Sequence, residues 1–368
     1  MKCYTISNTL LVSLVLLSCW ACRTDPSPSQ SATQTQSATV VDGKTMGTYY
    51  RVKYLDTLSR DLKKEMDELL LAINMDLSTY IPESVISKFN SSDQALVVGN
   101  LPAPLPAAAV MANEAVEHPH FLYNYLLSKD LHRRTNGAFD PSVMPLVRYW
   151  GFATEKRAVT KVDSLKVDSL RQLIGFDQFD LEWGPSAQLR KAKAGLSLDM
   201  SAVAKGYGVD EIGRLLDRKG IDNYLIDIGG EVVAKGKNEA GNWWTVGISV
   251  PDTDASPTDL AGKATLQNRA LATSGNYRNY YEVEGIKYGH TIDPATGFPR
   301  QDRLLSASVF APDCATADAF ATAFMVMGLE KAYALAEAEA DIEAYLIFGE
   351  SDGSMGIKYT PGLEGLVR

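Results

Sequence analysis

The stretch "CATADAFATAFMVMG", residues 314–328, has the composition of a helix that is buried inside a protein. Ala, Phe, Met and Val dominate it, and these side chains are common in protein interiors. Asp318 and Thr322 interrupt the apolar run, and because they are four positions apart a helix would point both the same way. Hard oxygen donors of this kind predict a corner of a Mg²⁺ site that is completed by water and phosphate oxygens. The structural alternative is that Asp318 complements the helix N-terminus and Thr322 bonds back to a carbonyl.

The composition of the whole chain limits the classes of protein to which it can belong. The chain has 368 residues, of which 45% are hydrophobic and 22% charged, so it is long enough to bury a sizeable core. Its net charge of -9 argues against phosphate-backbone binding as the main task, and we expect no nucleic-acid partner. Beyond Cys22 only Cys314 remains, and there are four histidines, so neither an internal disulfide nor a zinc or iron–sulfur site is expected.

The N-terminus predicts export. The apolar core "LLVSLVLLSCWAC" is too short to span a bilayer comfortably and is typical of a secretory signal. It leads into Cys19 in a context that resembles the lipobox of bacterial lipoproteins, with Cys22 as a second candidate for lipidation. We therefore predict a lipoprotein signal over 1–22, a Ser-, Thr- and Gln-rich flexible tether over 23–40 and a folded domain over 41–368. The mature protein is expected to be anchored to a bacterial membrane, facing the periplasm or the cell exterior. The alternative is a cleaved signal without lipid.

The folded part is predicted to be a single α+β domain, because no repeat and no second linker divides it. Several short antiparallel strands with long helices between them are the expected content. Strand patterns cover 45–55, 223–236, 243–250, 263–275, 279–292, 305–311 and 342–349, and helix patterns cover 59–80, 109–137, 162–175, 201–220 and 314–328.

A candidate phosphate seat lies in "LDMSAVAKGYGVD", residues 198–210. Asp199 and Lys205 flank a helix start at which Ser201 is predicted to be the N-cap, and the first turn of a helix attracts anions. Lys205 would add a positive charge for the same phosphate, and Asp199 could accept a hydrogen bond from a ring or a ribose. The alternative is a surface lysine and an acid that favours the helix N-terminus.

Two loops are further candidates. In "GAFDPS", residues 137–142, Gly137 and the Asp140-Pro141 turn could expose backbone amides to a ligand, or they could be a structural turn only. In "GHTIDPATGFP", residues 289–299, His290 precedes a second Asp-Pro turn. A histidine on so constrained a loop is a candidate general base, the alternative being a hydrogen-bonded loop histidine.

These segments, in this order, resemble the ApbE family of FAD:protein FMN transferases. The matching stretches are "TMGTYY", "LSTYIPESVISKFN", "TNGAFDPSVMPLVRYWGF", "LDMSAVAKGYGVD", "YLIDIGGEVVAKG", "ATSGNYRNYY", "HTIDPATGFP" and "ADAFATAFMVMG". They cover nearly everything from Gly43 to the end. The resemblance implies an α+β fold of the ApbE-like or T-fold-like kind, a single large domain of mainly antiparallel sheet flanked by helices. It also implies cleavage of the FAD pyrophosphate, transfer of FMN to a threonine or serine hydroxyl of an exported redox protein subunit, and release of AMP.

The resemblance assigns roles to particular residues. His290 would assist the attack of the hydroxyl, and Asp318 and Thr322 would ligate Mg²⁺ together with the backbone carbonyl of Ala202. Contacts to the flavin nucleotide would come from Met46, Tyr80, Ala138, Phe139, Asp140, Asp199, Lys205 and Ile292.

The chain departs from the family pattern at three positions: Asn276 where Asp is frequent, Asp227 where Asn is common, and Thr291 where an apolar residue is usual. A changed hydrogen-bond pattern is expected there. Two rival functions stay open, namely a Mg²⁺-dependent FAD pyrophosphatase that yields FMN and AMP, and a non-catalytic, lipid-anchored protein that binds flavin.

Overall fold

The computed structural model describes residues 38–368 apart from 154–158, 160, 253, 257, 277–279 and 284–285. The predicted signal at 1–22, with Cys19 and Cys22, lies outside the described residues. So does the predicted tether, except for its last three residues, which belong to the first strand because that strand begins at Ala38. The described residues make up one compact unit. None of the helices in the described part of the chain is long and apolar enough to cross a bilayer.

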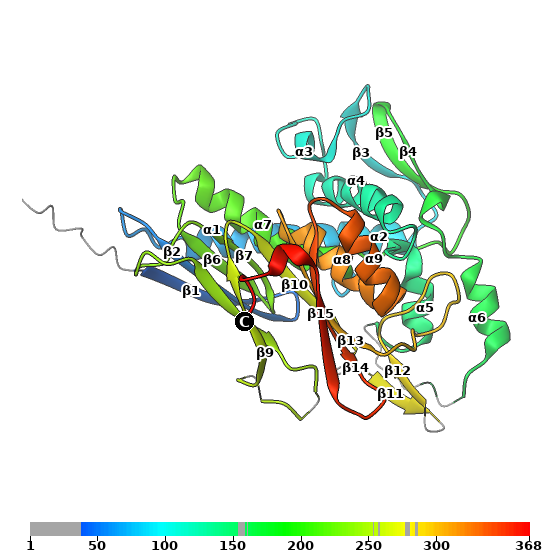
Figure 1. Ribbon diagram of the computed structural model, residues 1–368. Coiled ribbons are helices and arrows are strands. Elements are labelled where there is room, and N and C mark those ends of the chain that lie inside the picture. The colour runs from blue at the N-terminus through cyan, green and yellow to red at the C-terminus, as the bar shows by residue number, and fades with distance from the viewer. Residues whose placement is uncertain are drawn as a thin grey trace, which may run out of the picture. The chain divides into compact units, whose positions relative to one another are not determined.

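An eight-stranded sheet organises the unit, and every neighbouring pair of strands in it is antiparallel (Figure 1). The predicted α+β class with a mainly antiparallel sheet is therefore confirmed. In spatial order the strands are β1 (Ala38–Thr45), β2 (Thr48–Leu55), β6 (Tyr224–Ile228), β7 (Glu231–Lys235), β10 (Ala270–Gly275), β13 (Leu304–Ala311), β14 (Glu343–Gly349) and β15 (Met355–Tyr359).

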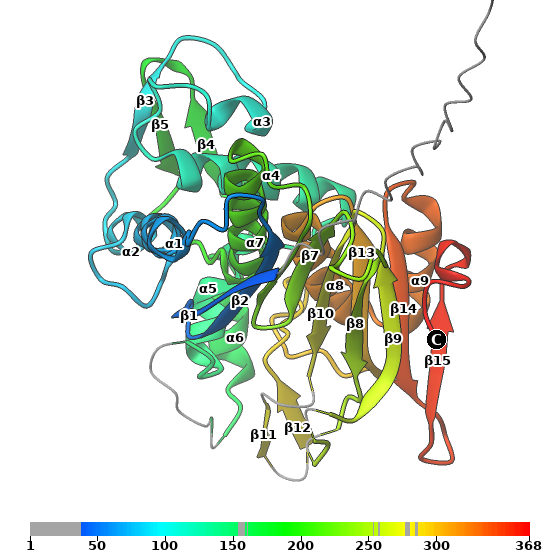
Figure 2. The ribbon, with the colours of Figure 1, turned by 90° about the vertical axis from the view of Figure 1, so that its left-hand side faces the viewer.

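The two faces of the sheet are covered differently. Helices cover one face, and the hairpin of β8 (Trp244–Ser249) and β9 (Leu260–Leu266) packs on the other (Figure 2). Because side chains alternate along a strand, Val232 of β7 joins the core under the hairpin while Val233 packs toward the helices. The helices that contact the sheet are α1 (Lys63–Leu77), α7 (Ser201–Arg218), α8 (Cys314–Met327) and α9 (Leu329–Ala338), and α4 (Pro119–Arg134) packs on α1, α7 and α8.

Smaller elements complete the unit. One separate sheet has the order β3 (Leu96–Leu101), β5 (Gly184–Lys191) and β4 (Phe179–Glu182), and β11 (Tyr280–Val283) pairs with β12 (Ile286–Gly289). The short helices are α2 (Val85–Ser91), α3 (Ala107–Val110), α5 (Met144–Tyr149) and α6 (Ser164–Arg171), with 3₁₀ turns η1 (Pro141–Val143), η2 (Phe176–Gln178) and η3 (Pro361–Leu363).

Three local expectations need correction. The predicted strand at 45–55 contains a turn at Met46 and Gly47, whose φ angles of 49° and 73° make a tight hairpin between β1 and β2. The helix expected over 109–137 is reduced to α4 and the end of α3, because Pro119 starts α4 at its first position. Ser201 is the first helical residue of α7 and not its cap, since Met200 occupies that position without a side-chain bond.

Candidate active site

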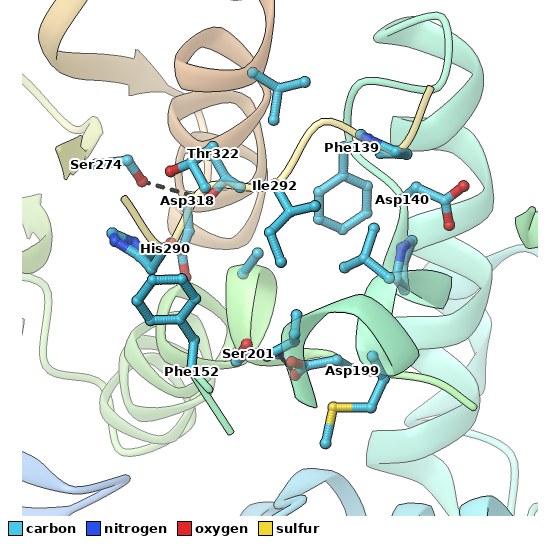
Figure 3. A pocket seen from close by; sticks show the side chains of 18 of the residues that line it. Phe139, Asp140, Phe152, Asp199, Ser201, Ser274, His290, Ile292, Asp318 and Thr322 are labelled. Atoms are coloured by element: carbon cyan, nitrogen blue, oxygen red, sulfur yellow. Dashed lines mark hydrogen bonds between the residues drawn. The ribbon is translucent and has the colours of Figure 1, made fainter. Parts of the chain in front are cut away.

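One cavity of about 390 Å³ gathers the residues predicted from the sequence (Figure 3). All of the predicted nucleotide, metal and catalytic positions line it except Met46. Met46 lies in the β1–β2 turn, where its side chain packs against the core beside Gly208 of α7, so its contact with flavin stays a prediction. Segments far apart in the chain thus meet around one space.

The floor of the cavity is formed where α7 and α8 cross. Cys314 and Ala315 at the start of α8 donate their backbone N–H groups to the two oxygens of Asp210 on α7, at 2.8 and 2.9 Å. These bonds satisfy donors that a helix N-terminus leaves open. Gly206 of α7 lies against the same point of α8, where a side chain would collide with the backbone of Cys314. The two helices are therefore held at backbone contact.

Asp318 and Thr322 face the cavity from α8, as their spacing predicted. Asp318 is 3% exposed, and its Oδ2 accepts the backbone N–H of Gly206 at 3.2 Å. The hydroxyl groups of Thr322 and Ser274, on β10, are hydrogen-bonded at 3.2 Å, as the dashed line in Figure 3 shows. Asp318 therefore binds the neighbouring helix and does not cap its own, which argues against the structural alternative for this residue.

Lys205 of α7 lies between two carboxylates. Its Nζ is 2.7 Å from Oε1 of Glu231, the first residue of β7, and 3.7 Å from Oδ1 of Asp318. Burial by itself would lower the pKa of Lys205, but Asp318 and Glu231 outweigh that effect and raise it above its ordinary value. Burial raises the pKa of Glu231 to about 7, against the lowering influence of Lys205. Lys205 is therefore charged at neutral pH.

The oxygen donors of Asp318, Thr322 and Ala202, which we call the cation corner, fit a divalent cation of the Mg²⁺ type. The carboxylate of Asp318, the hydroxyl of Thr322 and the carbonyl of Ala202 would offer oxygen donors, the kind that hard cations prefer, and all three residues line the cavity. Within the described ranges no group of three or more His, Cys, Asp or Glu side chains could form a full metal cage. Such a partial set is what Mg²⁺ uses when substrate phosphates and water supply its other ligands.

The start of α7, which is predicted to be a phosphate-binding site, has fewer open backbone N–H groups than expected. Oδ1 of Asp199 accepts the backbone N–H of Ser201 at 2.9 Å, so one of the open N–H groups of the helix already has a partner. The backbone N–H of Asp199 in turn donates to the carbonyl of Pro141 at 2.7 Å. Burial raises the pKa of the Asp199 carboxyl. Asp199 therefore fixes the helix start beside the cavity, and Lys205 lines the cavity one turn further along the same helix.

The turn that follows α4 forms another wall of the cavity. Asp140 caps η1 by accepting the backbone N–H and the hydroxyl of Ser142, at 2.8 and 2.6 Å. Burial raises the pKa of Asp140. Phe139 is buried beside it, and its carbonyl is hydrogen-bonded to Nδ1 of His132 at 2.9 Å. At the rim Tyr80 is 62% exposed. This wall combines apolar surface with a rigid turn, which suits a planar ring system.

His290 reaches the cavity from the loop after β12. Phe152 packs edge-to-face against its ring with the ring centroids 6.3 Å apart. The loop is tied to α5 because Nε1 of the buried Trp150 donates to the carbonyl of Gly297 at 2.8 Å. Ile292 lies beside Trp150 in the same small apolar cluster. The loop with the Asp-Pro turn therefore places His290 in the lining of the cavity, beside Phe152.

The three departures from the family pattern make hydrogen bonds of their own. Oγ1 of Thr291 donates to Oδ1 of Asn276 at 2.7 Å, so two of the unusual residues contact each other beside His290. Asp227 accepts the N–H of Gly230 at 2.8 Å and shapes the turn before Glu231.

Several lining residues were missed from sequence. Glu231, Ser274 and Phe152 line the cavity, yet none stood out by type or spacing. Glu231 lies inside the quoted segment "YLIDIGGEVVAKG", and an acidic residue directly after Gly229-Gly230 is the signal that could have found it. Ser274, within "ATSGNYRNYY", could have been found in the same way.

Known proteins resemble this chain over most of its length. The model of the ApbE family matches residues 46–346. The FAD:protein FMN transferase of Haemophilus influenzae is 36% identical over 321 residues, which cover 85% of this chain and 87% of that protein. The solved flavin transferase ApbE from Vibrio cholerae superposes with a TM-score of 0.74 at 32% identity, covering 90% of this chain and 99% of that one. The apo form of Pseudomonas stutzeri flavinyl transferase ApbE gives 0.73 at 30% identity, covering 90% and 96%. With the matched segments spread over most of the described fold, the chain belongs to the ApbE family.

Proposed function

We propose that this protein is an enzyme that transfers FMN from FAD to a threonine or serine hydroxyl of another protein, with Mg²⁺ as cofactor and AMP as leaving group. The observation that carries the proposal is the presence, in one cavity, of Lys205, the Asp318–Thr322 oxygen pair and His290. Family membership and the activity for which the relatives are named support it. The acceptors are proposed to be exported redox protein subunits.

The chemistry of the step is a displacement at phosphorus. The acceptor oxygen attacks the phosphorus of the FMN half, a new P–O bond forms, and the bond from that phosphorus to the bridging oxygen breaks. AMP departs with the bridging oxygen and its electron pair, and the hydroxyl proton passes to His290. A general base contributes on the order of 10²–10⁴-fold to such a step.

The cation corner and Lys205 would both stabilise the negative charge of the pyrophosphate. Asp318, Thr322 and the Ala202 carbonyl would hold a cation that stabilises negative charge on the phosphate oxygens. Lys205 adds a fixed positive charge on the same side of the cavity, so it lowers the cost of the charge that develops as the bond breaks. The turn at Ala138–Asp140 and Tyr80 would bind the isoalloxazine ring, and Ile292 would pack beside it.

The test combines the purified protein with FAD, Mg²⁺ and a threonine-bearing acceptor domain, and follows flavin fluorescence on the acceptor in a denaturing gel. Labelled acceptor together with AMP supports transfer. Free FMN and AMP without labelling would instead make the protein a pyrophosphatase, and unchanged FAD would make it a binding protein.

Two variants probe the cation corner in the same assay. Asp318→Ala is expected to reduce labelling by about 10²-fold or more, and excess EDTA should have the same effect on the unmodified protein. Asp318→Asn keeps an acceptor for the Gly206 N–H and so separates lost charge from lost packing. Asp168→Ala, which removes an exposed carboxylate on α6, is the control. Full labelling in EDTA would contradict the role of the cation.

We also propose that the protein is exported and anchored by lipid at Cys19 or Cys22, with the membrane as a partner. The apolar stretch before Cys19 and the polar segment after Cys22 support this. Labelling of cells with a radioactive fatty acid should mark the protein. Cys19→Ser should abolish that label if Cys19 is the site, and label that persists in the double variant Cys19→Ser/Cys22→Ser would refute the proposal.

A further inference from the structure

The ammonium of Lys205 is shared unequally by its two neighbouring carboxylates. The contact with Glu231 Oε1, at 2.7 Å, is a hydrogen bond, whereas the 3.7 Å to Asp318 Oδ1 is too long for one. The three residues come from β7, α7 and α8, so only the fold brings them together. The position of the ammonium therefore depends on Glu231 more than on Asp318.

Glu231 is held in place by the turn that precedes it. Gly229 and Gly230 have φ angles of 62° and 103° and form the two-residue loop between β6 and β7. Beyond the turn, β7 pairs with both β6 and β10 inside the large sheet. Glu231 is 4% exposed and lines the cavity, and in the described structure its second oxygen, Oε2, is buried without a hydrogen-bond partner. A rigid strand thus presents this carboxylate to the cavity.

We infer that Glu231 is a positioning residue that holds the Lys205 ammonium away from Asp318 and so keeps the Asp318 carboxylate available to the divalent cation. The inference rests on the proposed function in one respect, since it takes Asp318 as a ligand of the cation. It adds Glu231, whose proposed effect on the cation is exerted through Lys205 and Asp318.

The physical reason is competition between two cations for one carboxylate. If Glu231 no longer binds Lys205, Asp318 is, among the residues that the structure describes, the one other carboxylate paired with the ammonium. Shortening the Nζ to Oδ1 distance from 3.7 Å to a hydrogen-bonded distance would strengthen the attraction enough to favour Lys205 by about 10-fold at an effective dielectric constant of ~20. A divalent cation would then have to displace the ammonium from Asp318.

The experiment measures Mn²⁺ binding to the FAD-loaded protein without acceptor, from the electron paramagnetic resonance signal of free Mn²⁺. Glu231→Asp keeps the charge but withdraws the carboxylate by roughly 1.5 Å, one carbon–carbon bond, so it no longer reaches Lys205. We expect this variant and Glu231→Gln to weaken Mn²⁺ binding about 10-fold. In a Lys205→Met background, Glu231→Asp should cause no further loss.

Controls separate this role from other causes. Glu239→Gln removes a carboxylate from a comparable Lys–Glu pair, the contact with Lys53 at 2.5 Å, and lies outside the cavity, so Mn²⁺ binding should not change. Circular dichroism and melting temperature check that each variant is folded, and Glu231→Gln, which preserves side-chain length, replaces Glu231→Asp if the latter fails to fold.

Three results would overturn the inference: wild-type Mn²⁺ binding by Glu231→Asp, an equal loss in the Lys205→Met background, or no Mn²⁺ binding by the unmodified protein. If Glu231 acted only through its charge, Glu231→Asp would bind Mn²⁺ as the wild type does. If Glu231 acted independently of Lys205, Glu231→Asp would lose as much Mn²⁺ binding in the Lys205→Met background. Because no turnover is needed, absence of FMN transfer in the labelling assay would remove the proposed function while leaving the Mn²⁺ result to be judged by itself.

Discussion

Gly206 should be the least replaceable glycine of α7, because it lies where that helix meets α8 at backbone contact. A methyl group on Gly206 would lie 2.2 Å from the carbonyl oxygen of Cys314 and 2.8 Å from Cα of Ala315. Both are backbone atoms of α8, which Asp210 also anchors through two hydrogen bonds. No side chain can rotate out of the way, so Gly206→Ala must push the helices apart.

The expected change in the free energy of unfolding is the difference between two terms. Replacing a mid-helix glycine by alanine gains about 1 kcal/mol of helix propensity. Overpacking a rigid contact costs about 1–3 kcal/mol or more, and weakening the Gly206 N–H bond to Asp318 costs about 1 kcal/mol further. We therefore expect Gly206→Ala to destabilise the protein by about 1–3 kcal/mol.

Gly206→Ala should reduce the rate of FMN transfer by more than its loss of folding stability alone would cause. Asp318 and Thr322 are carried by α8, whereas Lys205 and Ala202 are carried by α7. Separation of the helices would therefore misplace the two halves of the proposed cation corner, and a misplacement of about 1 Å can cost on the order of 10²-fold in rate.

Urea unfolding followed by circular dichroism gives the stability, and the acceptor-labelling assay gives the rate. The matched control is Gly213→Ala on the same helix, where a methyl group would meet only side-chain tips, 3.2 Å from the Tyr224 hydroxyl and 3.7 Å from Cδ1 of Ile226. That variant should be neutral or up to about 1 kcal/mol more stable. Equal stability and equal labelling for Gly206→Ala and Gly213→Ala would refute the reasoning.

Two further predictions concern hydrogen bonds of residues that do not line the cavity, Asp56 and Trp150. Hydrogen bonds from Arg60 lower the pKa of the buried Asp56 from 3.8 to about 2, so this carboxylate contributes stability that is complete above pH 4–5 and is lost as the pH falls through 2. Between pH 5 and pH 2 the wild type should lose about 2 kcal/mol more than Asp56→Asn in urea unfolding, and parallel losses would contradict the assignment. Trp150→Phe keeps an aromatic ring but leaves the carbonyl of Gly297 without its donor, so we expect about 1–2 kcal/mol of destabilisation and slower labelling through a loosened His290 loop. Unchanged unfolding and labelling in that variant would show that the bond does not hold the loop.

The local patterns that were predicted correctly are those in which one segment contains all the necessary information. In α8, a run of apolar residues with Asp318 and Thr322 four apart specifies both a buried helix and the face that carries the oxygens. The Asp293-Pro294 turn likewise specifies a constrained loop after His290. The predictions were wrong where residues from elsewhere in the chain decide the local conformation. Met46 is predicted to lie in a strand, but it lies in a turn and its side chain packs on Gly208.

By itself the sequence determined the α+β class, the family and a set of site positions that all line the cavity except Met46, because helix periodicity, turn residues and ordered motifs are properties of short segments. Only the tertiary structure decided that Glu231 takes the ammonium of Lys205, that Gly206 brings two helices to backbone contact, and that Thr291 bonds to Asn276. Each of these pairs joins residues that are remote in the chain or belong to separate elements. Their distances are set by how helices pack on the sheet, and no spacing along a single segment encodes that packing.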